Sequence, residues 1–262
     1  MRVTLTVLLA ALLALVVQPA SAEQVVRVGA YHFPPYVTKP ESDAPGGLLP
    51  ELLGLLNRSQ GEYRFVLLPT STARRYRDFR HARFDMMIFE SSAWGWQGVD
   101  LTSLDLGIED AEVYVARAES GRGQDYFSEL KGKRLALYSG YHYGFAGFNA
   151  DQAFLTENYR AMLTYSHDSN LLMVLRGRAD IAVVTRSYLQ AYLAEHPRQG
   201  SGLLVSERVD QEYHHQALVR PGGPLSASAL AVLLDDLRRS GDLDLLLRRY
   251  YLSMPEGALV TP

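Results

Sequence analysis

The chain carries its only two tryptophans, Trp94 and Trp96, on either side of a single glycine. They follow an apolar stretch that ends in Glu90, and Ser91 and Ser92 lie between that stretch and the rings. Aromatic faces bind flat molecules and cations, and a carboxylate supplies the charge that an amine requires. We therefore interpret this segment as one wall of a binding cleft for a small organic molecule. The alternative is that both rings belong to the core.

Motifs for covalent, metal and phosphate chemistry are missing from the sequence. There are no cysteines, which excludes disulfides, thiol catalysis and cysteine-ligated metals. The seven histidines show no metal-ligand spacing, and the chain lacks H-E-x-x-H, G-x-S-x-G, P-loop and G-x-G-x-x-G patterns. A formal net charge of −3 argues against nucleic acid as a partner, because phosphate binding needs a basic face. We expect no metal and no cofactor.

The first 22 residues have the form of a secretory signal peptide. Arg2 precedes an apolar run over residues 3–17, and the Ala-Ser-Ala segment at 20–22 is a small-residue cleavage site. The run is short for a membrane-spanning helix. We expect cleavage before Glu23 and a mature chain in the periplasm, with an uncleaved membrane anchor as the alternative.

Strand and helix signals alternate along the rest of the chain. A first strand–helix–strand–helix–strand series implies a parallel sheet with helices on its faces. A second α/β series follows, and two helices that break at Gly241 close the chain. The predicted strands are 25–31, 63–69, 84–90, 111–120, 214–223 and one each within 126–140 and 169–196; the predicted helices are 46–59, 74–83 and segments within 126–140, 169–196 and 226–253.

The tryptophan segment follows the carboxyl end of the third predicted strand, residues 84–90. Open parallel sheets bind ligands beyond the carboxyl ends of their strands. Two such sheets that face each other form a cleft between two lobes. The sequence therefore predicts that the tryptophan segment lies in an interlobe cleft.

Six motifs in a fixed order make residues 25–252 resemble the family 3 periplasmic solute-binding proteins, the amino-acid-binding components of ABC importers. Two of them are Gly-x-x-Asp-type strands that contain Asp85 and Asp180. The segments that carry the resemblance are RVGAYHFPPYV with its aromatic-Pro-aromatic loop, GGLLPEL at a helix start, RFDMMI, ELKGKRLALYSG with Leu-Lys-Gly-Lys, LRGRADIAVV, and the terminal helix pair LRRSGDLDLLLRRYY.

This resemblance implies a periplasmic-binding-protein-like type II fold, in which two α/β lobes are joined by two hinge strands near 111–119 and 214–220. After the signal peptide, lobe 1 would comprise residues 23–118 plus 214–262, and lobe 2 residues 119–213. Closing the lobes would bury the ligand. The resemblance also implies an inner-membrane ABC permease as the partner of a monomeric protein, with docking on a membrane receptor as the alternative.

The charged groups with which the resembled family holds an amino acid are absent. The position of its carboxylate-binding arginine falls at or near Gln97, that of its amine-binding aspartate at Thr185, and that of its first-strand acid at Ala30. Charge-assisted hydrogen bonds contribute about 1.5–3 kcal/mol each, whereas micromolar binding amounts to about −8 kcal/mol in total. The sequence therefore argues against a free α-amino acid bound in the manner of that family.

Aromatic and polar side chains on the predicted cleft loops take the place of those charges. Phe33 aligns with the family's ligand-stacking aromatic residue, and Ser92 with a serine that touches the ligand. We expect a small polar, aromatic or amine-bearing ligand, with Glu90 either as its charged contact or in an ion pair with Arg74 or Arg75. The expected ligand-binding residues are Tyr31, Phe33, Tyr36, Glu90, Ser91, Ser92, Trp94, Trp96, Gln97, Tyr141, His142, Tyr143, Thr185 and Arg186.

Arginines leave two further possibilities open. Arg74, Arg75 and Arg186 could pair with an anionic ligand, although we expect them on solvated surfaces, where most arginines lie. Proteins of this fold also include periplasmic cyclohexadienyl dehydratases, which act on cyclic acids such as prephenate. Glu90 with His142, and Arg74 or Arg186, could supply the acid and the anion clamp of such an enzyme. We expect no enzymatic activity, because fold alone does not define function.

Overall fold

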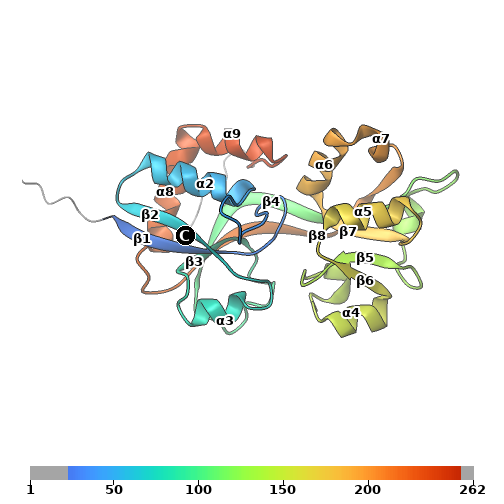
Figure 1. Ribbon diagram of the computed structural model, residues 1–262, viewed down its shortest axis with the longest axis horizontal. Coiled ribbons are helices and arrows are strands. Elements are labelled where there is room, and N and C mark those ends of the chain that lie inside the picture. The colour runs from blue at the N-terminus through green and yellow to red at the C-terminus, as the bar shows by residue number, and fades with distance from the viewer. Residues whose placement is uncertain (1–22, 255–262) are drawn as a thin grey trace, which may run out of the picture.

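Two α/β lobes lie side by side and share one sheet. The structure, a computed structural model, describes residues 23–254, and the predicted signal peptide lies outside the described residues. Figure 1 shows the lobes joined by two long neighbouring strands, β4 (Thr102–Arg117) and β8 (Leu203–Val219). Within the described residues, no helix combines the length and the apolar character needed to cross a membrane.

The first lobe is built from the predicted strand–helix–strand–helix–strand series. Strands β1, β2 and β3 run parallel, as their alternation with helices predicts. Helix α2 forms because leucines recur at helical spacing, and Leu48, Leu52 and Leu56 bury one face against β2 and the C-terminal helices. The bounds are β1 Gln24–Ala30, α2 Leu48–Ser59, β2 Tyr63–Pro69, α3 Arg75–Arg80 and β3 Met86–Glu90.

The second lobe repeats the α/β pattern, with β5 parallel to both β6 and β7. The sequence predicts no element between residues 141 and 166, where the structure has η2, α4 and β6. Their signals are weak because α4 buries only Leu155 and β6 is a short edge strand. The bounds are η1 Gln124–Phe127, β5 Leu135–Tyr138, η2 Gly144–Ala146, α4 Gln152–Tyr159, β6 Ala161–Thr164, α5 His167–Leu175, β7 Ile181–Thr185, α6 Arg186–Glu195 and α7 Pro197–Gly200.

Strands β4 and β8 unite the two halves into an 8-stranded sheet of order β2-β1-β3-β8-β4-β7-β5-β6. β8 pairs antiparallel with β3 in the first lobe, and β4 pairs antiparallel with β7 in the second. Both strands are longer than predicted. The prediction is too short because polar residues such as Asp105, Glu109 and Glu207 interrupt the apolar runs that indicate a strand. The two facing sheets expected from the sequence are therefore halves of one continuous sheet.

The strand pairings also bear on the lobe boundary. β4 pairs with β7 over residues 112–115, and its ladder with β8 shifts register between Asp105 and Glu109. Such irregularities bend a strand and disrupt the ladder locally. We propose that the chain leaves lobe 1 within residues 105–112, upstream of the boundary at 118 expected from the sequence.

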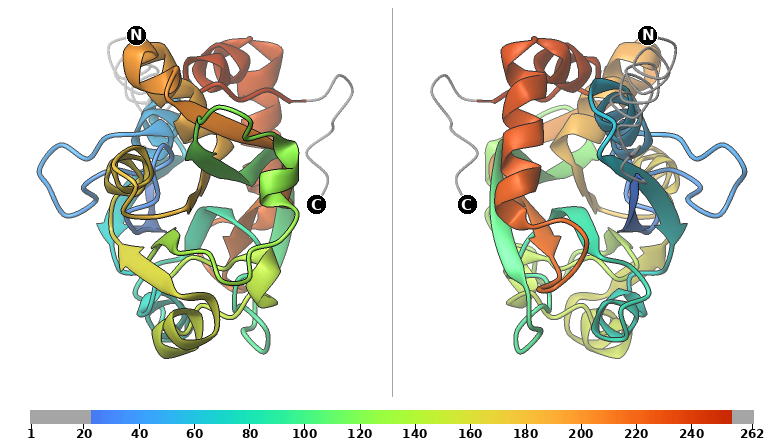
Figure 2. Two further views of the ribbon diagram at one scale, coloured as in Figure 1. Left: turned by 90° about the vertical axis from the view of Figure 1, so that its right-hand side faces the viewer. Right: turned by 90° about the vertical axis from the view of Figure 1, so that its left-hand side faces the viewer.

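Helices cover both faces of the sheet. In the first lobe, α2 lies on one face with α8 (Ala227–Arg239) and α9 (Asp242–Arg249), and α3 lies on the other (Figure 1). The break between α8 and α9 falls at Gly241, as predicted, where a φ of 83° favours a residue without a Cβ. Figure 2, which views the molecule from each end, shows α4 and α6 on opposite sides of the second lobe.

Asp85 and Asp180, from the two Gly-x-x-Asp-type motifs, have equivalent structural roles in the two lobes. Asp85 precedes β3 and accepts hydrogen bonds from the backbone and guanidinium of Arg27 and from Arg220. Asp180 precedes β7 and accepts the corresponding bonds from Arg134. Burial acts to raise the pKa of Asp85, but the hydrogen bonds from the two arginines outweigh it and hold the pKa below its usual value.

We predict that Asp85→Asn lowers the free energy of unfolding by about 2–3 kcal/mol at pH 7, less than a fully buried ion pair would, because Arg27 is partly solvated. The carboxylate stabilises the fold above its unfolded pKa of about 3.9, and this contribution is lost as the pH falls through the lower folded pKa. Urea unfolding of the wild type and of Asp85→Asn measures the loss of unfolding free energy at pH 7 and at pH 3. Asp180 is more exposed than Asp85, so Asp180→Asn should lower the free energy of unfolding by less than Asp85→Asn does. An equal loss for Asp85→Asn at both pH values would contradict the role of its charge.

Candidate functional site

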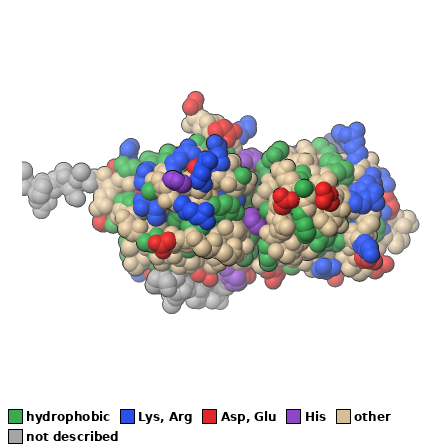
Figure 3. All heavy atoms as spheres, turned by 90° about the horizontal axis from the view of Figure 1, so that it is seen from below, with side chains coloured by type: hydrophobic (Ala, Val, Ile, Leu, Met, Phe, Trp, Pro, Cys, Tyr) green, Lys and Arg blue, Asp and Glu red, His purple; other side chains and the backbone are tan. Residues whose placement is uncertain are grey.

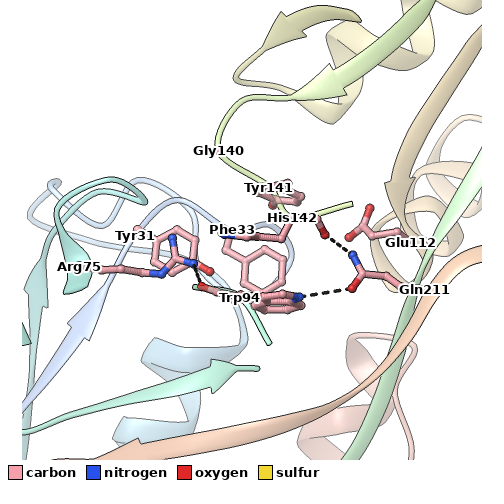
Figure 4. A pocket seen from close by; sticks show the side chains of 9 residues that line it. All are labelled: Tyr31, Phe33, Arg75, Trp94, Glu112, Gly140, Tyr141, His142 and Gln211. Atoms are coloured by element: carbon pink, nitrogen blue, oxygen red, sulfur yellow. Dashed lines mark hydrogen bonds between the residues drawn. The ribbon is translucent and has the colours of Figure 1, made fainter. Parts of the chain in front are cut away.

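A cavity lies between the two lobes, beside β4 and β8. Its free volume in this arrangement of the lobes is small, about 20 Å³, which is room for about one water molecule. The lining comes from the segments after β1, β3 and β5, from the start of α3, and from β4 and β8, so that both lobes contribute (Figure 4). The lining residues are Tyr31, Phe33, Arg75, Trp94, Glu112, Gly140, Tyr141, His142 and Gln211.

Phe33 is the centre of an aromatic wall that both lobes contribute. Its ring lies edge-to-face with Trp94, at 5.8 Å between centroids, and with Tyr141 of the second lobe, at 5.4 Å. Tyr31 stacks nearly parallel to Phe33 at 5.8 Å. Rings in this arrangement can contact a flat molecule or a cation from more than one side.

Gln211 on β8 ties loops of the two lobes together across the cavity. Its side-chain oxygen accepts a hydrogen bond from Trp94 Nε1 at 3.3 Å, and its amide nitrogen donates to the carbonyl of His142. Gly140 approaches Thr72 of the first lobe so closely that a Cβ would lie 2.7 Å from the Thr72 hydroxyl. The lobes are therefore in contact around the cavity, in a closed arrangement.

A buried ion pair lies within the first-lobe side of the site. Arg75 is 1% exposed and Glu90 0%, and Arg75 Nε lies 3.3 Å from Glu90 Oε1. Trp96 Nε1 donates to Glu90 Oε2 at 2.8 Å, and the Arg75 guanidinium donates to the carbonyls of Thr72 and Trp94. Burial raises the pKa of Glu90, and Arg75 and Trp96 oppose that rise. As a neutral unit, the pair offers a ligand no net charge.

The burial of Arg75 corrects the expectation that the arginines of the α3 segment are all solvated. Arg74 is exposed as expected, whereas Arg75 points inward at the start of this short helix. The guanidinium lies 4.9 Å from the ring centre of Tyr31 and 4.4 Å from that of Tyr76. The sequence left Glu90 either as a ligand contact or in an ion pair with Arg74 or Arg75, and in the structure it forms the ion pair with Arg75.

The expected ligand-binding residues divide into three groups. Those that line the cavity are Tyr31, Phe33, Trp94, Tyr141 and His142. Those that are buried outside the lining are Tyr36, Glu90, Trp96, Tyr143 and Thr185. Those at partly or fully exposed positions outside the lining are Ser91, Ser92, Gln97 and Arg186.

Both tryptophans are buried in the core cluster, which is the second alternative drawn from the sequence, but their neighbours differ. Trp94 lines the cavity. Trp96 packs against the rings of Tyr76 and Phe79, with centroids at 4.9 Å and 5.4 Å, and belongs to the core. Gly95 between them has a φ of 81°, and a Cβ there would lie 2.8 Å from the Tyr76 hydroxyl. The glycine thus permits the turn that separates the two rings.

Glu112, on β4, is a cavity residue that the sequence analysis did not single out. Its Oε1 accepts hydrogen bonds from Thr185 at 2.9 Å and from Tyr213 at 3.3 Å, while Oε2 has no hydrogen-bond partner within residues 23–254. Burial raises the pKa of Glu112 well above its usual value, and nearby Asp110 and Asp210 add to the rise. A buried polar atom without a partner costs about 1–3 kcal/mol.

The pKa values of three histidines near the site lie below the ordinary value, which favours the neutral imidazole at pH 7. Burial and, to a smaller degree, Arg75 lower the pKa of His142 to about 4. Burial also lowers the pKa of His167 and of His215 to about 3. The part of the chain that the structure describes contains no group of three or more His, Asp or Glu side chains able to hold a metal ion. The cavity thus offers rings, neutral hydrogen-bonding groups and one incompletely bonded carboxyl group.

No family model matches the chain, and no curated protein sequence matches it. Solved structures resemble it. The ligand-binding core of GluR0 in complex with L-glutamate is 14% identical, with a TM-score of 0.68 over 87% of this chain and 99% of that chain. The substrate-binding protein of an amino acid ABC transporter is 18% identical, with a TM-score of 0.59 over 87% and 99%. A histidine kinase sensor domain with similarity to periplasmic binding proteins is 17% identical, with a TM-score of 0.62 over 89% and 99%.

These likenesses confirm the predicted fold, in which two α/β lobes are arranged as in periplasmic binding proteins. At such low sequence identity the similarity concerns the fold alone. The residues that line the cavity must therefore be interpreted from their own chemistry.

We predict that the Arg75–Glu90 pair is strongly coupled. Arg75→Met should lower the free energy of unfolding by about 3–5 kcal/mol, because it leaves a carboxylate buried without its counterion. Glu90→Gln should cost a similar amount, and the double variant should lose clearly less than the sum of the two. Urea unfolding of the four proteins gives this double-mutant cycle. Arg74→Met, at the exposed neighbouring position, is the control and should change stability by no more than about 0.5 kcal/mol; strictly additive losses would rule the coupling out.

Proposed function

We propose that this chain is a periplasmic solute-binding protein that captures a small organic molecule between its two lobes. The observation that carries the proposal is the origin of the cavity walls. Phe33 and Trp94 come from the first lobe, Tyr141 from the second, and Glu112 and Gln211 from the two strands that join them. Because the free space between them is small, an organic molecule would need the lobes to lie somewhat further apart than in this structure. Between the lobes it would contact all of these parts at once, so its binding would favour a closed arrangement around it.

A hinge motion of the lobes would give the solute access to this cavity. Seen from below in Figure 3, the lobes are two rounded masses with a constriction between them. Asp110 on β4 connects the lobes, because its Oδ2 accepts hydrogen bonds from Tyr36 of the first lobe at 2.5 Å and from Ser187 of the second at 2.6 Å. Hinge closure needs only a few residues that change their backbone angles, and the irregular ladder of β4 supplies candidates.

The ligand is proposed to be a small polar molecule that is aromatic or bears an amine. Phe33, Trp94 and Tyr141 provide ring contacts for either kind. An anionic ligand is less well supported, because it would have to compete with Glu90 for Arg75. This composition also agrees with the argument against an α-amino acid clamped by the charges of the resembled family.

The proposed partner is an inner-membrane ABC permease, which a monomeric binding protein would supply with its solute. The signal peptide predicted over residues 1–22 supports export to the periplasm. Docking on a membrane receptor is the alternative, since the same fold serves an ABC transporter in one neighbour and a histidine kinase sensor domain in another.

The dehydratase alternative has less support from the geometry. Glu90 is enclosed by Arg75 and Trp96, and Arg186 lies 3.8 Å from Asp110, outside the cavity lining. The acid and the arginines named for this role from the sequence, Glu90 with Arg74 or Arg186, are therefore not among the residues that line the cavity.

A thermal-shift screen of residues 23–262, unfolded and refolded beforehand to remove any carried ligand, tests the proposal. A compound that binds the folded chain raises Tm by mass action, with about 2.7 kcal/mol of added stability at 100 times its Kd. We expect stabilisation by aromatic or amine-bearing compounds. A screen in which no amine, aromatic compound, amino acid or sugar raises Tm would overturn the proposal.

We also predict that Trp94, and not Trp96, reports ligand binding by fluorescence. Trp94 lies in the cavity wall against Phe33, whereas Trp96 is enclosed by the core and by Glu90. The fluorescence change on adding a stabilising compound should therefore persist in Trp96→Phe and disappear in Trp94→Phe. The opposite pattern would place the ligand away from the cavity. Calorimetry on both variants shows whether binding itself is retained.

A further inference from the structure

We infer that Glu112 is the counterion for a positively charged head group of the ligand, so that the cavity selects organic cations such as primary amines over carboxylates. The inference rests on the proposed function and deepens it, because it assigns the charge of the solute and the residue that binds it. The sequence led us to expect Glu90 in this role, but the Glu90 carboxylate already forms an ion pair with Arg75.

The incomplete hydrogen bonding of Glu112 carries the inference. Glu112 is 3% exposed and lines the cavity from β4. Its Oε1 accepts two hydrogen bonds, whereas Oε2 accepts none from the described residues. A buried carboxyl oxygen is unfavourable without a donor, and an N–H group of a molecule in the cavity would supply one. In Figure 4 the Glu112 carboxylate lies across the cavity from Arg75 and Tyr31.

A second unpartnered group lines the same cavity from the second lobe. The hydroxyl of Tyr141 is buried and has no hydrogen-bond partner within residues 23–254. A head group with several N–H donors, such as an ammonium, could bond to this oxygen as well as to Glu112. One donor-rich ligand would give both oxygens of this lining a partner.

The neighbouring hinge carboxylates lack this unused capacity. Asp110 accepts hydrogen bonds from Tyr36 and Ser187 through Oδ2 and from backbone N–H groups through Oδ1. Asp210 accepts bonds of 2.6–2.9 Å from two backbone N–H groups and a tyrosine hydroxyl. Neither residue belongs to the cavity lining, so Glu112 is the acidic residue placed to meet a ligand.

The charge balance of the lining also favours a cation. Its only Lys or Arg side chain is Arg75, and the charge of Arg75 is matched by Glu90. A carboxylate ligand would therefore find no unpaired cation in the lining, whereas an ammonium would favour the ionised form of Glu112 that burial disfavours. An ammonium would gain both the Glu112 carboxylate and the electron-rich faces of Phe33 and Trp94.

Probes that differ only in their charged group test the inference on the refolded wild-type chain. Phenethylamine, 2-phenylethanol and phenylacetate share one ring and differ at the end of the chain, and the corresponding phenol and indole series extend the comparison. Calorimetric titration should show at least one amine binding about tenfold or more tightly than its alcohol and its carboxylate. The inference is overturned if no amine binds, or if carboxylates bind as tightly as amines.

Glu112→Gln provides the matched variant, because it removes the charge and keeps the shape. We expect the best amine to lose at least about tenfold in affinity, while the neutral alcohol changes by less than about twofold. Glu109→Gln is the control, since Glu109 lies on the same strand but is exposed and close to His214, and amine affinity should not change. Unchanged amine binding in Glu112→Gln would overturn the inference.

The outcomes separate this inference from the proposed function. A neutral or anionic ligand identified by the thermal-shift screen would overturn the role of Glu112 and leave solute binding intact. A screen without any ligand would overturn both. The wild-type probe series needs no variant, so a Glu112→Gln protein that fails to fold would not weaken the test.

Discussion

The antiparallel pairing of β4 with β8 is the constraint on which the rest of the structure depends. The two strands pair with each other along most of their length, and each also pairs with a strand of one lobe. Because residues directly opposite in such a ladder share a face, the register sets Glu112 opposite Gln211 beside the cavity. The part of the molecule that joins the lobes therefore also forms part of the site.

Two buried carboxylates of this protein differ in their partners, and the difference separates a structural role from a proposed role in ligand binding. Glu90 accepts a hydrogen bond from the indole of Trp96 and lies in an ion pair with Arg75, although Glu90 Oε1 and Arg75 Nε are not themselves hydrogen-bonded. Glu112 is buried at the cavity with one oxygen likewise without a donor, and no Lys, Arg or His within residues 23–254 forms an ion pair with it. Burial of a charged or polar group is unfavourable unless it is bonded, and an incompletely bonded group of this kind is expected at functional sites. We propose that the solute supplies the missing partner.

The fold could be predicted from the sequence because its signals are local. The leucines of α2 recur at helical spacing, and Gly241 marks the end of α8. The cavity loops after β1, β3 and β5 could be predicted as well, since they follow from the general behaviour of parallel strands. The lengths of β4 and β8 could not, because their central residues are polar and gain their partners only from distant strands.

The site could be predicted only in part, because burial and ion pairing depend on distant contacts. Arg75 resembles its exposed neighbour Arg74 in sequence, and only the fold shows that it points toward Glu90. Glu112 could have been found from the alternation of its strand. Ala111, Val113 and Val115 belong to one core cluster, which turns Glu112 to the other face, toward the cavity.

The central claim is that a solute in the cavity holds the two lobes closed. Since the chain has no cysteines, one can be introduced at exposed Arg58 on α2 and one at exposed Glu157 on α4, and both can carry spin labels. The most direct test is the distribution of label-to-label distances in the refolded protein, with and without a compound that raises Tm. We expect a broad distribution in the empty protein and a single narrow one with the compound bound. A distribution that is identical in the two samples would contradict the claim.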